Sequence, residues 1–203
     1  MTTRWSALVS GAGIVLALAL APSITRAQGA DKTKPVVVME TSLGSIRIEL
    51  DSERAPKSVE NFLRYVKADF YAGTIFHRVI SDFVVQGGGY TASLRQKAAL
   101  FPPIALEVKG TSKNLRGTVA MARTDEANSA TCQFFINVED NPSLDYDPSQ
   151  PGPNGFAVFG RVVAGMDVVD KMRAVPVSPG AISEAVPNTP VVIKAVRTDE
   201  AGR

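Results

Sequence analysis

The sequence predicts a mainly β domain, folded as a closed or nearly closed antiparallel barrel. Many short segments rich in β-branched and aromatic residues follow one another, and only two segments look helical. Of the 203 residues, 45% are hydrophobic and 21% are charged, which is typical of a globular chain and too apolar for a disordered one. We therefore expect one folded domain with a short appendage.

Residues 1–27 have the pattern of a secretory signal peptide. Arg4 gives the amino-terminal region a positive charge. Residues 7–21 then form an uncharged apolar segment, which is shorter than the ~18 residues that a membrane span needs. Small side chains just before Gln28 favour cleavage there, which leaves residues 28–35 as a flexible lead-in. We expect export with no membrane anchor after cleavage, and an uncleaved anchor is the alternative.

Charge and rare residues exclude several functional classes. The formal net charge is +2, but residues 1–27 hold two of the 22 basic residues and none of the 20 acidic ones, so the rest of the chain is neutral. A basic field for nucleic acid is therefore not expected. The single Cys132 excludes an intramolecular disulfide, and the single His77 excludes a histidine-rich metal site.

A β-hairpin and a helix open the domain. Residues 36–39 are apolar, and residues 45–50 alternate polar and apolar side chains after a turn at Gly44, so we expect two strands with one wet face. Pro56 suits a first helical turn. The residues after it show the i, i+3, i+4, i+7 spacing of one helix face: Val59, Phe62, Leu63 and Val66.

Short strands dominate the remainder. We expect them at residues 74–80, 83–86, 117–121, 133–138, 156–163 and 191–196. Residues 165–172 form a second, short helix. Glycines 87–89 end the strand before them, at a point where the backbone passes close to a neighbour. Residues 90–116 and 139–155 are less regular.

Hydrolytic chemistry is poorly supported by the residues present. A Ser-His-Asp triad would have to use His77, which lies in an apolar strand pattern, and no Gly-x-Ser-x-Gly elbow is present. A nucleophilic pair of Cys132 and His77 has the right residue types. Cys132 lies at the start of an apolar strand, however, which indicates a side chain that packs in the core. We expect a site without an acid–base pair, metal or cofactor.

One strand face could combine a cation, amides and aromatic rings. If the strands alternate, Phe76 and Arg78 share a face, and so do Gln133 and Phe135. Periodicity alone leaves two interpretations open. This face is a binding site, or its phenylalanines are barrel core and Arg78 is a solvated edge charge.

The sequence resembles the cyclophilins, a family of peptidyl-prolyl cis–trans isomerases. Residues 76–80, Phe83 and residues 86–88 resemble the family's signature segment, and the resemblance covers residues 36–198. It continues at residues 117–122, 129–131, 133–136 and 159–160, and residues 122–124 and 136–141 look most like the bacterial periplasmic branch. The resemblance implies an eight-stranded antiparallel barrel capped by two helices, and a periplasmic protein.

The resemblance also implies a set of site residues. Arg78 matches the catalytic arginine, and Gln86 matches the glutamine that hydrogen-bonds the substrate backbone. The implied substrate-binding residues are Phe83, Val84, Met121, Ala122, Arg123, Gln133, Phe135, Leu144 and Phe156.

This sequence departs from the family pattern at three positions. Val84 replaces a common methionine, Phe156 a common histidine, and Ser143 a tryptophan that contacts cyclosporin in many eukaryotic members. Loss of that indole removes a large contact and a hydrogen-bond donor, so weak cyclosporin binding is expected.

The implied function is isomerisation of X–Pro bonds in exported polypeptides, by a monomer without a cofactor. The expected partners are unfolded or extended chains that contain proline, and not nucleic acid. A non-catalytic proline-peptide binding module or holdase chaperone is the alternative, because pocket and catalyst overlap. A lipocalin-like carrier is less favoured, since the many large apolar residues would fill a barrel of this size.

Overall fold

The computed structural model describes residues 1–2, 34–108, 110 and 113–199. Nearly all of the expected signal peptide (1–27) and most of the expected lead-in (28–35) lie outside these residues. Within the described part of the chain, no helix has the length and apolar character that a bilayer crossing requires.

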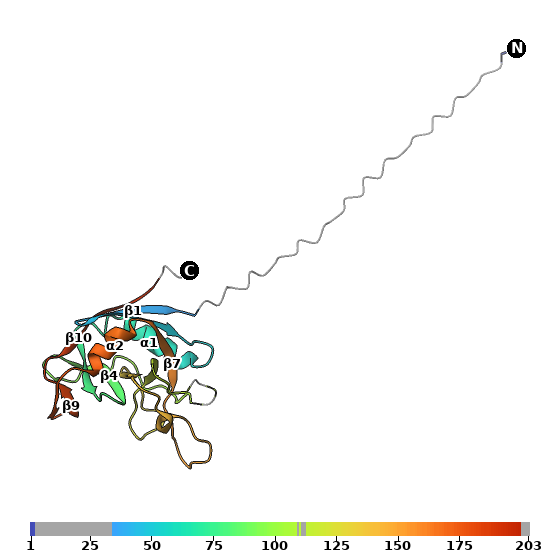
Figure 1. Ribbon diagram of the computed structural model, residues 1–203. Coiled ribbons are helices and arrows are strands. Elements are labelled where there is room, and N and C mark those ends of the chain that lie inside the picture. The colour runs from blue at the N-terminus through green and yellow to red at the C-terminus, as the bar shows by residue number, and fades with distance from the viewer. Residues whose placement is uncertain (3–33, 109, 111–112, 200–203) are drawn as a thin grey trace. The chain divides into compact units, whose positions relative to one another are not determined.

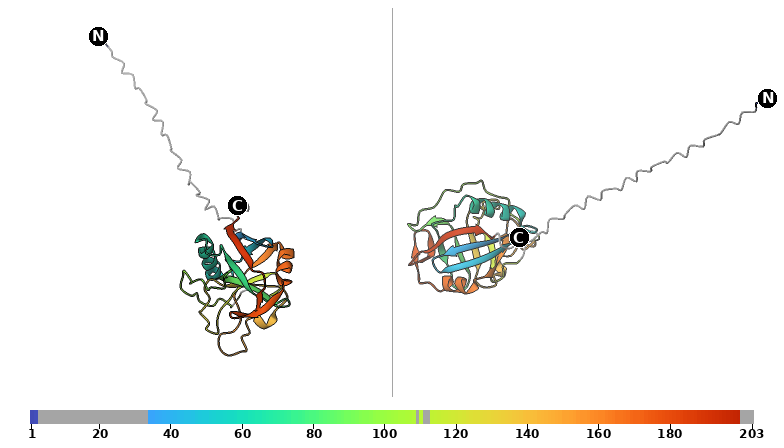
Figure 2. Two further views of the ribbon diagram at one scale, coloured as in Figure 1. Left: turned by 90° about the vertical axis from the view of Figure 1, so that its left-hand side faces the viewer. Right: turned by 90° about the horizontal axis from the view of Figure 1, so that it is seen from above.

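Eight antiparallel strands close a barrel in the order β1-β10-β3-β4-β6-β5-β7-β2 (Figure 1). Two helices, α1 (Pro56–Lys67) and α2 (Met166–Arg173), lie on opposite sides of it (Figure 2). The expected barrel with two helices is therefore confirmed. The strands of the barrel are β1 (Val36–Thr41), β2 (Gly44–Leu50), β3 (Thr74–Val79), β4 (Val84–Thr91), β5 (Thr118–Met121), β6 (Phe134–Asn137), β7 (Val158–Ala164) and β10 (Val191–Thr198).

Three shorter elements lie outside the barrel. A 3₁₀ turn, η1 (Pro142–Leu144), interrupts the long loop before β7. A separate two-stranded sheet is formed by β8 (Val177–Gly180) and β9 (Ser183–Pro187). Sequence periodicity does not reveal this hairpin, because every residue of β8 is exposed and no apolar alternation marks it.

Large side chains fill the barrel interior. Phe62 of α1 packs with ring centroids 5.2 Å from Tyr71, 5.6 Å from Phe134 and 5.2 Å from Phe159, and all four side chains are buried. Of the stripe that the helix spacing predicts, Val59 and Phe62 are buried, and the other two residues are partly buried against the core. Arg64 lies in the last turn, where it suits the helix dipole. A filled interior leaves no room for a carrier's ligand, which excludes the lipocalin-like alternative.

Strand β4 does not end at its glycines, as the sequence suggests, but runs on to Thr91. The close backbone approach expected there is confirmed. Gly88 has φ +86°, and a Cβ on it would lie 2.9 Å from ring atoms of Phe134 and Tyr71. These glycines therefore keep the strand paired where larger residues would collide with the core.

Strand β3 departs from strict alternation. Its register with β4 shifts between Phe76 and Arg78, so that one extra residue bulges out of the ladder. Phe76 is fully buried in the interior cluster, whereas the Arg78 side chain is 26% exposed. The prediction that these two residues share a face is therefore wrong, and the bulge is what turns Arg78 outward.

Candidate active site

A small apolar cluster lies apart from the barrel interior and gathers most of the expected binding residues. Its buried members come from β4, β5, β6 and β7: Val84, Ala120, Phe135 and Val158. Four partly buried residues pack against them: Phe83, Ala122, Leu144 and Phe156. These side chains come from segments far apart in the sequence, and together they form an apolar wall on the outside of the barrel.

Polar residues lie beside this wall because of the strand register. Arg78 of β3 is paired with Gln86 of β4, and Gln86 is paired with Phe135 of β6. The Gln86 side-chain amide donates a hydrogen bond of 3.1 Å to the Gln133 side-chain oxygen. A cation, two amides and an aromatic ring therefore follow one another across three neighbouring strands.

The Arg78 guanidinium is paired and held near an aromatic ring. Its Nε donates a hydrogen bond of 3.0 Å to Oε1 of Glu184, and its Nη2 forms an ion pair with the same oxygen at 2.8 Å. Its Cζ lies 5.9 Å from the ring centroid of Phe83. The hydrogen bond from Arg78 is the main reason why the pKa of Glu184 is below its usual value. Arg78 is thus a charged group on the edge of the apolar wall, and not a freely solvated one.

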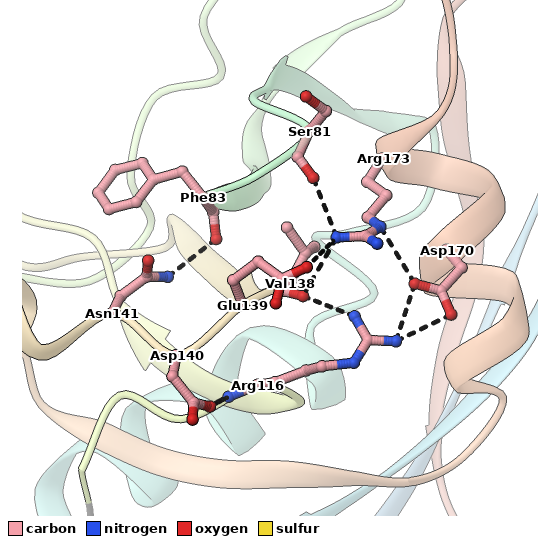
Figure 3. A network of polar contacts seen from close by, with 9 residues as sticks. All are labelled: Ser81, Phe83, Arg116, Val138, Glu139, Asp140, Asn141, Asp170 and Arg173. Carbon is pink, nitrogen blue, oxygen red and sulfur yellow. Dashed lines mark hydrogen bonds and ion pairs between the residues drawn. The ribbon is translucent and has the colours of Figure 1, made fainter.

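The turn that carries Phe83 is anchored from behind (Figure 3). Asn141 donates a hydrogen bond of 2.9 Å to the Phe83 carbonyl, and Arg173 of α2 donates one of 3.1 Å to the Ser81 carbonyl. Arg173 is itself held by an ion pair with Asp170, at 3.2 Å between Nε and Oδ1. The turn between β3 and β4 is therefore tied to the helix and to the loop after β6.

Three buried asparagines connect two walls of the cluster. Besides the bond to Phe83, the Asn141 amide donates to the Asn137 side-chain oxygen at 2.8 Å. Asn137 in turn donates to the Asn114 oxygen at 3.3 Å, and Asn114 donates to the Leu144 carbonyl at 2.9 Å. Buried amides are favourable only when they are hydrogen-bonded, so this chain fixes the Phe83 and Leu144 backbones relative to each other.

Arg123 forms the far end of the wall. Its guanidinium Cζ lies 4.8 Å from the ring centroid of Phe156, and its Nε donates to the Gly155 carbonyl at 3.1 Å. The Phe156 ring packs edge-on against Phe135, with centroids 5.6 Å apart. The Arg123 side chain is thus folded against the loop that carries Phe156.

Met121 is the expected site residue that the structure keeps apart from this cluster. Its side chain is buried with the barrel interior, whereas its neighbours Ala120 and Ala122 belong to the outer cluster. The strand alternation of β5 explains the difference, because successive side chains point to opposite faces. The described residues hold no group of three or more His, Cys, Asp or Glu that could bind a metal ion.

His77 and Cys132 are both buried, as packing residues are. Burial, helped by the nearby Arg78 charge, lowers the pKa of His77 to about 4, so its ring is neutral at pH 7. Burial raises the pKa of the Cys132 thiol, which makes it a poor nucleophile.

Comparison with known proteins identifies the family. The family model of "Cyclophilin type peptidyl-prolyl cis-trans isomerase/CLD" matches residues 36–198. The chain belongs to the cyclophilins. It is 50% identical to peptidyl-prolyl cis-trans isomerase cyp18 of Streptomyces antibioticus, over 79% of this chain and 96% of that protein. It is 48% identical to peptidyl-prolyl cis-trans isomerase A of Dickeya dadantii, over 81% of this chain and 85% of that protein.

A solved cyclophilin has the same fold at low sequence identity. The cyclophilin-type isomerase of Cryptosporidium parvum superposes with a TM-score of 0.67 at 24% identity, covering 82% of this chain and 98% of that one. That protein has also been crystallised in the presence of the dipeptide Ala-Pro. Family and relatives together make this cyclophilin a peptidyl-prolyl cis-trans isomerase.

Proposed function

We propose that the outer apolar cluster and Arg78 form the isomerase active site, and that the clients are exported proteins. Rotation about an X–Pro bond meets a barrier of ~18–20 kcal/mol, because the resonance of the amide is lost as it twists. No bond is made or cut, so the enzyme needs no nucleophile, metal or redox group. It must bind the twisted amide better than either planar form.

Arg78 supplies the interaction that strengthens during the twist. When resonance is lost, the prolyl nitrogen gains a lone pair that can accept a hydrogen bond. A guanidinium stays charged at any working pH and holds its N–H groups in a rigid fork. Beside an apolar wall that excludes water, its charge acts more strongly than in bulk solvent. Arg78 therefore favours the transition state over the ground states.

The apolar cluster and the amides hold the peptide around that bond. The proline ring packs against Phe83, Phe135 and Leu144. Phe156 extends this apolar wall, and the Arg123 guanidinium packs on the Phe156 ring. Gln86, fixed by its hydrogen bond to Gln133, holds the peptide backbone. One side of the X–Pro bond then stays fixed while the other side rotates.

The observation that carries this proposal is the register of β3, β4 and β6. It sets Arg78 opposite Gln86 and Gln86 opposite Phe135, so the cation, the backbone-binding amide and the pocket ring are neighbours. The Ala-Pro dipeptide of the Cryptosporidium protein suggests the smallest ligand to test on this chain.

The leader pattern of residues 1–27 supports a periplasmic role. We expect the protein recovered from the periplasm to begin at Gln28, which amino-terminal sequencing of that fraction checks. Recovery of the uncut chain in the membrane fraction would favour the uncleaved anchor instead.

A protease-coupled assay on a short peptide containing proline separates an enzyme from a non-catalytic binding module or holdase. We expect turnover by the wild type and a loss of at least about 100-fold in Arg78→Ala, in the range of losses from removing one transition-state donor. Peptide binding without turnover in the wild type would favour the holdase.

A further inference from the structure

Glu184 of β9 lies 106 residues from Arg78 in sequence and is its ion-pair partner in the fold. One oxygen, Oε1, makes both contacts: it accepts a hydrogen bond of 3.0 Å from Nε and forms an ion pair of 2.8 Å with Nη2. We propose that Glu184 is a positioning residue, which holds the Arg78 guanidinium in the orientation that isomerisation uses. This inference rests on the catalytic role proposed above for Arg78.

The β8–β9 hairpin holds the backbone of Glu184 in place. The three residues after it in β9, residues 185–187, are buried, and two of them pair with β8: Pro187 with Val177, and Val186 with Ser178. Glu184 itself is exposed and lies directly before this buried run. The carboxylate therefore projects from a backbone that packing holds in place.

The second carboxylate oxygen of Glu184 is held from behind. Ser183 donates a hydrogen bond of 3.2 Å to Oε2, and the Ser183 hydroxyl accepts one of 3.1 Å from the backbone N–H of Ala185. Oε1 is then the oxygen left to face Arg78. A chain of contacts runs from the hairpin backbone through Ser183 and Glu184 to the guanidinium.

The pairing leaves part of the guanidinium available for substrate. In the described part of the chain, no hydrogen bond engages Nη1 of Arg78, and the contact of Nη2 with Glu184 is an ion pair. An arginine side chain has many rotamers, and ordering it during the reaction would cost free energy. Glu184 orders it beforehand, at a surface where the ion pair itself adds little to the stability of the fold.

Glu184 has two opposite effects on catalysis: its oxygen orients the guanidinium, and its negative charge offsets part of the positive charge of Arg78. Two substitutions separate these effects. A carboxylate next to Arg78 weakens the positive field at the pocket. Because a single oxygen makes both contacts, the side-chain oxygen of a glutamine can take the same place and accept the hydrogen bond from Nε. Glu184→Gln therefore keeps the orientation and removes the charge, whereas Glu184→Ala removes both.

The test compares kcat and KM of purified Glu184→Ala, Glu184→Gln and wild type on one tetrapeptide containing proline. We expect kcat of Glu184→Ala to fall roughly three- to tenfold, the factor for freeing one arginine side chain, with KM little changed. Glu184→Gln should match or exceed the wild type. The control is Glu40→Ala, which breaks an exposed ion pair with Arg197 between β1 and β10 and should leave kcat unchanged.

An NMR spectrum of the arginine Nε–H groups reports the positioning directly. The Arg78 signal should be protected from solvent exchange in the wild type and in Glu184→Gln, and should exchange faster in Glu184→Ala. Wild-type kcat in Glu184→Ala, or an equal loss in Glu184→Gln, overturns the inference. If Arg78→Ala itself keeps full activity, the catalytic role proposed for Arg78 is wrong. That result differs from one in which Arg78 is essential and Glu184 can be removed without loss.

Discussion

His77 shows how a single buried residue of β3 should shape the pH dependence of stability. The residue is 4% exposed, and its ring centroid lies 4.5 Å from that of Tyr90. Its pKa is about 4, against 6.5 for an exposed histidine. Below pH 6.5 the His77 ring is protonated in the unfolded chain, whereas in the folded chain it stays neutral down to about pH 4. Stability must therefore fall as the pH drops through this window.

We expect His77 to remove about 3 kcal/mol of unfolding free energy between pH 6.5 and 4, at about 1.4 kcal/mol per pKa unit. Urea unfolding at several pH values measures the slope. The variant His77→Phe, which keeps a ring against Tyr90, should unfold with a shallower pH dependence. Identical slopes in the two proteins would show that His77 is protonated in the folded state as easily as in solution.

Ser143 is the residue for which we expect altered inhibitor binding. It is exposed in η1, next to Leu144 of the outer cluster, where many eukaryotic cyclophilins have tryptophan. Without an indole the protein should bind cyclosporin weakly, and Ser143→Trp should strengthen inhibition without changing turnover on peptides. Titration of isomerase activity with cyclosporin measures both, and tight inhibition of the wild type would contradict this expectation.

At the scale of elements, the turn between β3 and β4 and the loop after β6 act as one unit. The asparagine chain joins Phe83 to Leu144, and Arg173 ties the same turn to α2. We infer that these buried amides set the spacing of Phe83 and Leu144 in the outer cluster.

Asn141→Ala tests that spacing. We expect it to lose about 1–3 kcal/mol of unfolding free energy, since it leaves a buried partner unsatisfied, and to raise KM for a proline peptide several-fold. The control is Thr41→Val, which removes a partly buried 2.7 Å hydrogen bond to the Gly44 carbonyl in the β1–β2 hairpin. Thr41→Val should lose similar stability at unchanged KM, and an equal KM effect in both variants would refute a specific role.

At the scale of the whole molecule, periodicity and the family resemblance predict different amounts of the structure. Helix spacing places α1 correctly, because its buried stripe faces a filled interior. Alternation places Phe135 correctly in β6 but fails in β3, where the bulge separates Phe76 from Arg78. A bulge depends on pairing with a distant strand, and a local pattern does not carry that information.

The parts of the site that sequence reasoning misses are those made by long-range contacts. Glu184 lies on a hairpin whose first strand is entirely exposed, so no apolar pattern draws attention to it. Asn114 lies in a stretch without regular pattern, and only the fold brings it to Asn137. Asn137 is the part of this chain that a sequence can indicate, because it is a polar residue in an apolar strand segment. A buried amide needs a hydrogen-bond partner, although the sequence does not say which residue supplies it.

The central claim is that Arg78 accelerates rotation and does not merely bind the peptide. Exchange NMR of an Ala-Pro peptide measures the affinity and the cis–trans rate in one sample. For Arg78→Ala, the account predicts an affinity within a few-fold of the wild type and an exchange rate at least about 100-fold lower. Wild-type exchange in Arg78→Ala would contradict it.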